Sequence, residues 1–285
     1  VLPAVVTLLA IASSVEAQVT ARAYSEGGVA TANAQVLVRR WVLEQGIQHF
    51  YDVGRGVCHQ VMLEEGLVQP GEIALGTDSH ATAYGAIGAF GTGVGSRDMA
   101  IALASGQTWL RVPETIRVRV HGRFRPFVSP KDLSLYLCGM LGLDGATYQA
   151  VEFHGVEWLP LDGRETLASM TTELGAKAGL LPPVGDALDG FEVPDWLALQ
   201  EGARYVRTVD VDLDELTSRV SVPPEVDHVR PAAELSDVRV HQVFIGTCTN
   251  GRLSDLRAAA DILRGRSVAD GVRLLVIPAS HRVLQ

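Results

Sequence analysis

Apolar residues along the chain follow helical spacing in some stretches and strand spacing in others. Residues 33–46, NAQVLVRRWVLEQG, carry valine and leucine at near-helical spacing and stop at Gly46, which predicts a helix. Residues 115–121, TIRVRVH, alternate strictly between apolar and polar, as in a strand with one buried face. Residues 129–142, SPKDLSLYLCGMLG, begin with an N-cap serine and a first-turn proline, so they predict a second helix.

The last part of the chain repeats this alternation in a recognisable unit. HQVFIG and GVRLLVIPAS read as strands, and LSDLRAAADILRG between them reads as a helix, which together predict a βαβ unit. Cys248 then lies on the loop after the first of these strands, at the carboxyl end of the sheet, where open α/β folds gather ligand chemistry. The alternation as a whole predicts an α/β fold.

Two proline-bearing stretches, RVPET near residue 113 and VPPEVDHVRP at 222–231, are plausible domain boundaries. They divide the chain into a first α/β domain, a second α/β domain and the start of a third, incomplete one, preceded by an atypical N-terminal segment. The expected ranges are 28–114, 115–230 and 231–285, with the atypical segment at 1–27.

The atypical segment leaves alternatives open. Residues 2–17, LPAVVTLLAIASSVEA, form an apolar block followed by small residues in an A-x-A-like pattern, which is similar to a secretory signal. However, no basic residue precedes the block, and it is too short to span a bilayer. A signal, an ordinary buried helix and an atypical or misread terminus are the three interpretations.

Composition narrows the function. Lys and Arg number 24 against 33 Asp and Glu, a net charge of −9, and no basic run could neutralise phosphates, so we expect neither a nucleic acid nor a membrane partner. The 3 cysteines are widely spaced and do not form the disulfide framework of a secreted domain, which favours a cytoplasmic protein.

Two short stretches carry candidate chemistry. TDSH, which contains Asp78, Ser79 and His80, follows an apolar strand and offers a carboxylate, a hydroxyl and an imidazole that could bind a hydroxylated anion and move protons. The competing interpretation is an Asx-type turn with a structural histidine. His59 in GVCHQV, taken alone, is more often a buried structural histidine than a catalytic one.

In combination these stretches resemble a known family. GVCHQVMLEEGLVQPGEIALGTDSHATAYGAIGAFGTGVGSRDMA is followed in order by DGATYQAVEFHG, ELGAKAG and VFIGTCTNGRLSDLRAA. This series resembles the aconitase family over roughly residues 28–285, and within it the large subunits of 3-isopropylmalate dehydratase and homoaconitase-like proteins. The resemblance implies aconitase-type α/β/α three-layer domains, truncated at the C-terminus.

The resemblance also implies a mechanism. Family members are hydro-lyases in which three cysteine thiolates hold a [4Fe-4S] cluster and an open iron binds the substrate as a Lewis acid. Cys248 matches the first cluster ligand. His59, Asp78 and His80 match catalytic residues, and Ser79 matches a substrate-binding residue.

Several family features have no match in this sequence. The C-x-x-C that supplies the other two cluster ligands is absent, and Cys58 and Cys138 are expected to be small buried apolar side chains rather than replacements. The Asp-His pair that precedes residues 33–46 in the family is also absent, as are the arginines and the swivelling domain with its serine base. In the isopropylmalate branch that domain is a separate small subunit, which is therefore the expected partner.

The implied function is interconversion of 2- and 3-isopropylmalate or similar hydroxy di- or tricarboxylates, in leucine biosynthesis. The alternatives are a homoaconitate or dimethylmalate hydratase, or a non-catalytic truncated remnant that serves as a binding or assembly module. We expect the chain to be a fragment that is inactive alone.

Overall fold

The computed structural model describes residues 29–198 and 202–285, so the atypical segment 1–27 and its possible signal lie outside the described residues. The α-helices are α1 (Val29–Glu44), α2 (Cys58–Glu64), α3 (Ser96–Ser105), α4 (Pro130–Leu141), α5 (Leu161–Met170), α6 (Leu253–Leu263) and α7 (His281–Leu284). The 3₁₀ helices are η1 (Ser79–Ile87), η2 (Thr171–Leu174), η3 (Asp186–Leu188) and η4 (Ala232–Leu235). The strands are β1 (Ile73–Gly76), β2 (Phe90–Gly93), β3 (Thr115–His121), β4 (Ala150–His154), β5 (Ala178–Leu180), β6 (Arg207–Asp212), β7 (Arg219–Ser221), β8 (Val229–Pro231), β9 (Gln242–Ile245) and β10 (Arg273–Val276).

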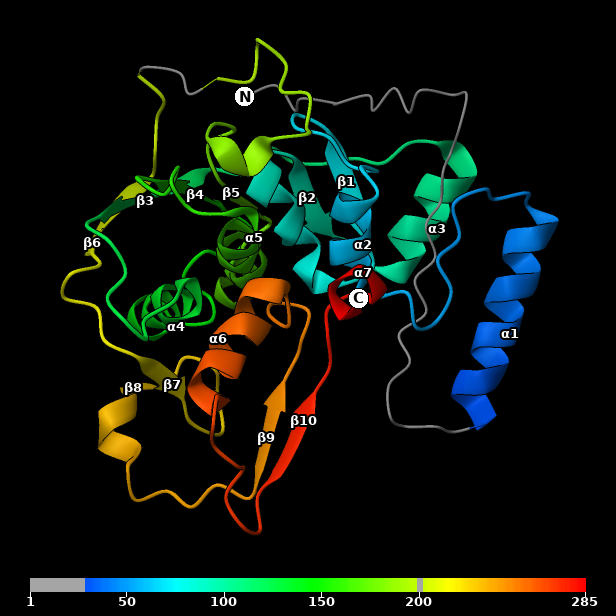
Figure 1. The fold of residues 1–285 in the computed structure, drawn as a ribbon. Coiled ribbons are helices and arrows are strands. Elements are labelled where there is room, and N and C mark those ends of the chain that lie inside the picture. Colours follow the sequence, from blue (N-terminus) through cyan, green and yellow to red (C-terminus); the bar gives the residue numbers. More distant parts are fainter. Residues whose placement is uncertain (1–28, 199–201) are drawn as a thin grey trace.

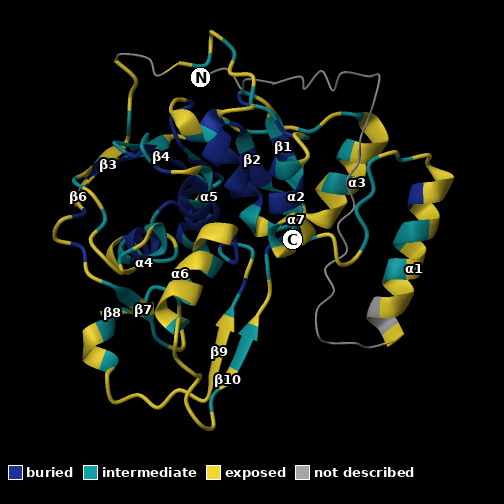
Figure 2. Ribbon diagram, viewed as in Figure 1, coloured by how far each residue is buried: buried dark blue, intermediate teal, exposed yellow. Residues whose placement is uncertain are grey.

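The central sheet has four parallel strands in the order β5-β4-β3-β6. Strand β3 has the bounds predicted from its alternation, and Ile116, Val118 and Val120 all point into the core. Helices α4 and α5 pack against each other and contribute Leu133 and Leu167 to the same apolar core. Within this unit α5 is almost entirely buried and is drawn dark blue in Figure 2.

A second core forms around the parallel pair β1–β2 and helices α2 and η1. The two cores are joined where η1 lies against β5 and α5. Gly85 permits this contact, since a Cβ atom at that position would lie 1.5 Å from the carbonyl oxygen of Gly179. Helix η1 is thereby fixed between the two cores, and its first residues form part of the candidate site.

The predicted βαβ unit is confirmed: β9 and β10 are parallel and α6 connects them. Figure 1 shows this pair extending away from the two cores. After β10 the chain returns to the start of α2. There Ser280 forms an isolated antiparallel β-bridge with Gly56, and the Val57 N–H donates to the Ala279 carbonyl at 2.8 Å. This return anchors the segment after β10 beside the start of α2.

The predicted α/β class is confirmed, with parallel main sheets, and β7–β8 is a separate antiparallel pair that contacts α4. The predicted helix at 33–46 is present as α1, which begins earlier and buries Val42 while Val36 and Leu43 remain exposed. The proposed domain boundaries stay a prediction. None of the helices in residues 29–198 and 202–285 combines the length and apolar character needed to cross a membrane.

Candidate active site

The structure brings the predicted site residues together from three separate elements. His59 is the second residue of α2, Asp78 is the N-cap of η1, and Ser79 and His80 are the first two residues of that helix. Cys248 lies on the loop between β9 and α6, as predicted. The start of η1 and the Cys248 loop each follow the carboxyl end of a strand in a parallel pair, β1 and β9 respectively.

Asp78 links the two histidines. Its Oδ1 atom lies 3.0 Å from His59 Nε2 and accepts a hydrogen bond from the His80 backbone N–H at 2.9 Å. One carboxylate therefore both caps η1, as in an Asx-type turn, and pairs with an imidazole. Hydrogen bonds from His59 and His80 hold the pKa of Asp78 well below its usual range, although burial acts in the opposite direction.

His59 is buried, with 1% of its side chain exposed. Its Nδ1 atom lies 3.3 Å from the Tyr84 hydroxyl and 3.7 Å from Cys58 Sγ. Burial lowers the pKa of His59, but hydrogen bonds to Asp78 and Cys58 outweigh it and raise the pKa to about 9. This histidine is thus a buried cation held by neighbouring acceptors.

His80 is the more accessible of the two imidazoles, with 16% of its side chain exposed. Its Nδ1 atom lies 3.5 Å from Asp78 Oδ1, its Nε2 atom lies 3.3 Å from Glu173 Oε1, and it hydrogen-bonds the Cys248 side chain. Burial lowers the pKa of His80, yet Asp78, Cys248 and Glu173 together raise it to about 11. The Cys248 thiol therefore lies directly beside a protonated imidazole.

Glu173 was not singled out from the sequence as a site residue. It is the first residue of the ELGAKAG stretch that carries part of the family resemblance, which was the available signal. In the structure it belongs to η2, and its hydrogen bond to His80 lowers its pKa. Ser79, by contrast, is exposed, with its Oγ atom 3.4 Å from His80 Nδ1.

The other two cysteines occupy different environments. Cys138 is a residue of α4 and is fully buried in the core, in agreement with the prediction, and burial raises its pKa to about 12. The same prediction for Cys58 is wrong: it begins α2, is only half-buried and lies beside His59. Its position at the start of a helix that faces the site keeps it out of both apolar cores.

This arrangement suits proton transfer near an anion. His59 faces the carboxylate of Asp78, and His80 faces those of Asp78 and Glu173. The pKa values of both imidazoles lie above neutrality, and His80 is also partly open to solvent. Such a group can donate a proton to a departing hydroxyl group or pair with a substrate carboxylate.

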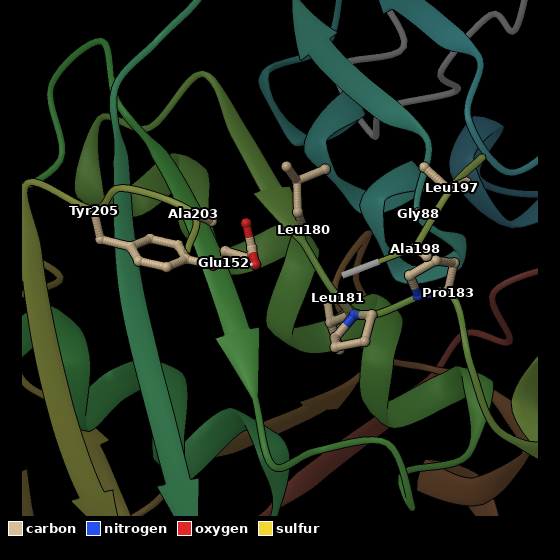
Figure 3. A pocket seen from close by; sticks show the side chains of 10 residues that line it. Gly88, Glu152, Leu180, Leu181, Pro183, Leu197, Ala198, Ala203 and Tyr205 are labelled. Carbon is tan, nitrogen blue, oxygen red and sulfur yellow. Dashed lines mark hydrogen bonds between the residues drawn. The ribbon is translucent and has the colours of Figure 1, made fainter. Parts of the chain in front are cut away.

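A cavity of about 250 Å³ lies elsewhere, between the central sheet and the loop after β5. Figure 3 shows Tyr205 and Glu152 at one side of it and Leu181 and Pro183 at another. The Tyr205 hydroxyl donates to Glu152 Oε1 at 2.9 Å. None of the predicted site residues lines this cavity.

Comparison with known proteins shows to which proteins this chain is related. The homoaconitase large subunit of Thermus thermophilus is 56% identical over 257 residues, which cover 89% of this chain and 61% of that protein. The 3-isopropylmalate dehydratase large subunit 1 of Deinococcus radiodurans is 53% identical over 259 residues, which cover 90% of this chain and 59% of that protein. The chain thus spans less than two thirds of the length of these relatives.

The fold agrees with this relationship. Aconitase X of Thermococcus kodakaraensis, in its holo form, matches 90% of this chain and 61% of its own with a TM-score of 0.55 at 16% identity. The model of the family described as Aconitase family (aconitate hydratase) matches residues 2–234 and 225–285. This range begins inside the segment 1–27, for which no resemblance was expected. The chain therefore belongs to the aconitase family.

Proposed function

We propose that this chain forms part of the large subunit of a hydro-lyase that interconverts hydroxy di- or tricarboxylates such as 2- and 3-isopropylmalate. The observation that carries the proposal is the contact of His80 with Asp78, Glu173 and Cys248, which joins an acid, its partners and a thiol from distant segments. Relatives named as 3-isopropylmalate dehydratase and homoaconitase large subunits support the same reaction class.

In this proposal His80 is the general acid. As the C–O bond of the substrate breaks, protonated His80 gives its proton to the departing oxygen, which leaves as water. Asp78 and Glu173 hold the imidazole in place and keep it protonated beforehand. Ser79 is the proposed contact for a substrate carboxylate or hydroxyl, which its exposed position beside His80 supports.

The cysteines of this chain do not fit a complete [4Fe-4S] cluster. Three thiolates are needed in the family, yet Cys138 is enclosed in a core, and among the described residues no group of three His, Cys, Asp or Glu side chains is arranged to hold a metal ion. We therefore propose Cys248 as one ligand only. The polypeptide of residues 1–285 alone is expected neither to assemble a full cluster nor to turn over substrate.

The proposed partner is a small subunit that carries the swivelling domain. The relatives are named as large subunits, which supports a two-chain enzyme. By the family resemblance this partner supplies the base that removes the carbon-bound proton, since the described site offers an acid in His80. The small subunit would also help to select among isopropylmalate, homoaconitate and dimethylmalate.

The test is a chimera in which the 257 matched residues of the Thermus thermophilus large subunit are replaced by their counterparts from this chain. The chimera, combined with the Thermus small subunit under anaerobic conditions, is assayed for hydration of each unsaturated acid. We expect activity that falls by about 100-fold or more in His80→Gln, in line with the loss of a general acid. Cys248→Ser is expected to lower the iron content as well.

His121→Gln is the matched control, because His121 is an exposed histidine at the end of β3 that pairs with Asp210. It is expected to retain activity. A folded, iron-loaded chimera in which His80→Gln and Cys248→Ser are as active as the parent would contradict the proposal. An iron-loaded chimera without activity would favour the binding-module alternative.

A further inference from the structure

Arg252 has an unusual position for an arginine, because it is almost fully enclosed. Only 2% of its side chain is exposed, and its NH2 nitrogen lies 2.8 Å from Oε2 of Glu165, which is fully buried. Its Nε donates to the same oxygen at 2.9 Å and to Gln60 Oε1 at 3.1 Å. Burying a charged pair costs free energy unless the geometry satisfies its hydrogen bonds, so this contact requires an explanation.

The partners of Arg252 belong to the segments that carry the candidate site. Gln60 follows His59 on α2, and Glu165 and Thr166 lie on α5. The NH1 nitrogen of Arg252 donates to Thr166 Oγ1 at 3.3 Å and to the carbonyl of Thr249, the residue after Cys248. Thr166 Oγ1 in turn donates to that same carbonyl at 3.0 Å.

The same network continues beyond the arginine. Gln60 Nε2 donates to Glu64 Oε1 at 3.0 Å, and Ser280 Oγ donates to the same oxygen at 2.7 Å. The guanidinium thus connects the Cys248 loop, α2 and α5 with a planar, forked set of donors that a lysine could not reproduce. No member of this network other than Gln60 and Thr249 adjoins a proposed site residue in sequence.

We infer that Arg252 is a positioning residue, which fastens the Cys248 loop to α2 and α5 and so keeps Cys248 beside His80. The inference rests on the proposed function for the importance of Cys248, but the fastening itself requires neither iron nor substrate. Glu165 has a matching role as the acceptor: its Oε2 holds the guanidinium, while its Oε1 has no hydrogen-bond partner among the described residues.

The test is amide hydrogen exchange of the full chain, measured over residues 246–252 and, as an internal reference, over β3. In Arg252→Met we expect exchange in the loop to accelerate at least about tenfold more than exchange in β3, because loop opening requires only local loss of structure. Arg252→Lys keeps a positive charge beside Glu165 but lacks the forked set of guanidinium donors. Amide exchange in the loop is therefore expected to be as fast as in Arg252→Met.

A double variant, Glu165→Leu with Arg252→Met, separates positioning from the cost of an unpaired buried charge. Replacing both charges with apolar groups is expected to restore thermal stability but not the slow exchange of the loop. Arg264→Met, which removes an exposed ion pair with Asp261, is the matched control and should leave the loop slow.

Slow loop exchange in the double variant would overturn the inference, since Arg252 would then only neutralise Glu165. Unchanged loop exchange in Arg252→Met, or acceleration that is equal in the loop and β3, would also overturn it. If Arg252→Met fails to fold, the double variant decides alone. None of these outcomes bears on the dehydratase chemistry, which the chimera tests separately.

Discussion

His59 Nε2 lies 3.0 Å from Asp78 Oδ1, in a pair whose imidazole is 1% exposed and whose carboxylate is 17% exposed. The contact joins α2 to the start of η1, two segments that the sequence separates by a strand. Because the imidazole is desolvated, its charge depends on acceptors within the protein rather than on water. The pair therefore favours the protonated form of His59 and holds α2 against the start of η1.

Asp78→Asn tests this dependence directly. Without the carboxylate, only Cys58 would oppose the effect of burial, so the pKa of His59 is expected to fall from about 9 towards its ordinary value of about 6.5. Histidine NMR resonances followed through a pH titration would measure the change. Asp210→Asn, which removes a carboxylate beside the exposed His121, is the control and should leave His59 as it was. A His59 pKa that stays near 9 in Asp78→Asn would contradict this account.

The same histidine should make stability depend on pH. Its pKa is raised in the folded state, so its stabilising contribution is complete below about pH 6.5 and is lost as the pH rises through about 9. In that window the unfolded chain binds fewer protons than the folded one, so the free energy of unfolding falls with pH. One group accounts for at most about 1.4 kcal/mol per pH unit.

Urea unfolding of the parent and of His59→Gln between about pH 6 and pH 9 measures this contribution by difference. The difference in unfolding free energy between the two proteins should shrink as the pH rises. A constant difference would mean that His59 does not keep an extra proton in the folded state.

Gly85→Ala should destabilise the protein strongly. The added Cβ would lie 1.5 Å from the Gly179 carbonyl oxygen, and backbone on both sides prevents a local adjustment. Overpacking of this kind costs about 3 kcal/mol or more. Gly95→Ala is the matched control, because its nearest contact is the movable Asp98 carboxylate at 3.3 Å. Equal midpoints of urea unfolding for the two variants would show that η1 and β5 are not packed as closely as described.

Local sequence signals predicted much of the fold correctly. Ser129 and Pro130 mark the start of α4, and Asp132 Oδ2 accepts from the Ser129 backbone N–H at 2.7 Å, a contact that fixes the first turn. The alternation in 115–121 gave β3 because one face of that strand is fully buried. Cys248 was placed on its loop because the flanking strand, helix and second strand are all locally encoded.

Contacts between distant segments could not be predicted in the same way. Glu173 and His80 are far apart in sequence, and only the packing of η1 on α5 and η2 brings them together. Arg252 belongs to the stretch VFIGTCTNGRLSDLRAA that carries part of the family resemblance, yet its burial depends on Glu165 and Gln60 from two other helices. The prediction for Cys58 was wrong because no local sequence pattern distinguishes a half-buried cysteine at the start of a helix from a fully buried one such as Cys138.

Strands β9 and β10 are expected to be the least protected of the parallel strands. They form a two-stranded sheet, and side chains such as Phe244 and Val276 are about half exposed, as the yellow and teal colouring of this pair in Figure 2 shows. Parallel sheets are normally covered on both faces, and isolated pairs of strands are marginally stable. Opening of this pair should therefore cost less free energy than opening of β3 and β4.

Hydrogen exchange of the isolated chain measures this difference. Amides in β9 and β10 should exchange at least about 100-fold faster than those in β3 and β4, since a difference of about 2.7 kcal/mol in opening free energy corresponds to that ratio. The chimera with the Thermus large subunit should slow exchange in β9 and β10 if it supplies the cover that these strands lack. Protection of β9 and β10 equal to that of β3 in the isolated chain would mean that the β9–β10 pair is stable without further cover.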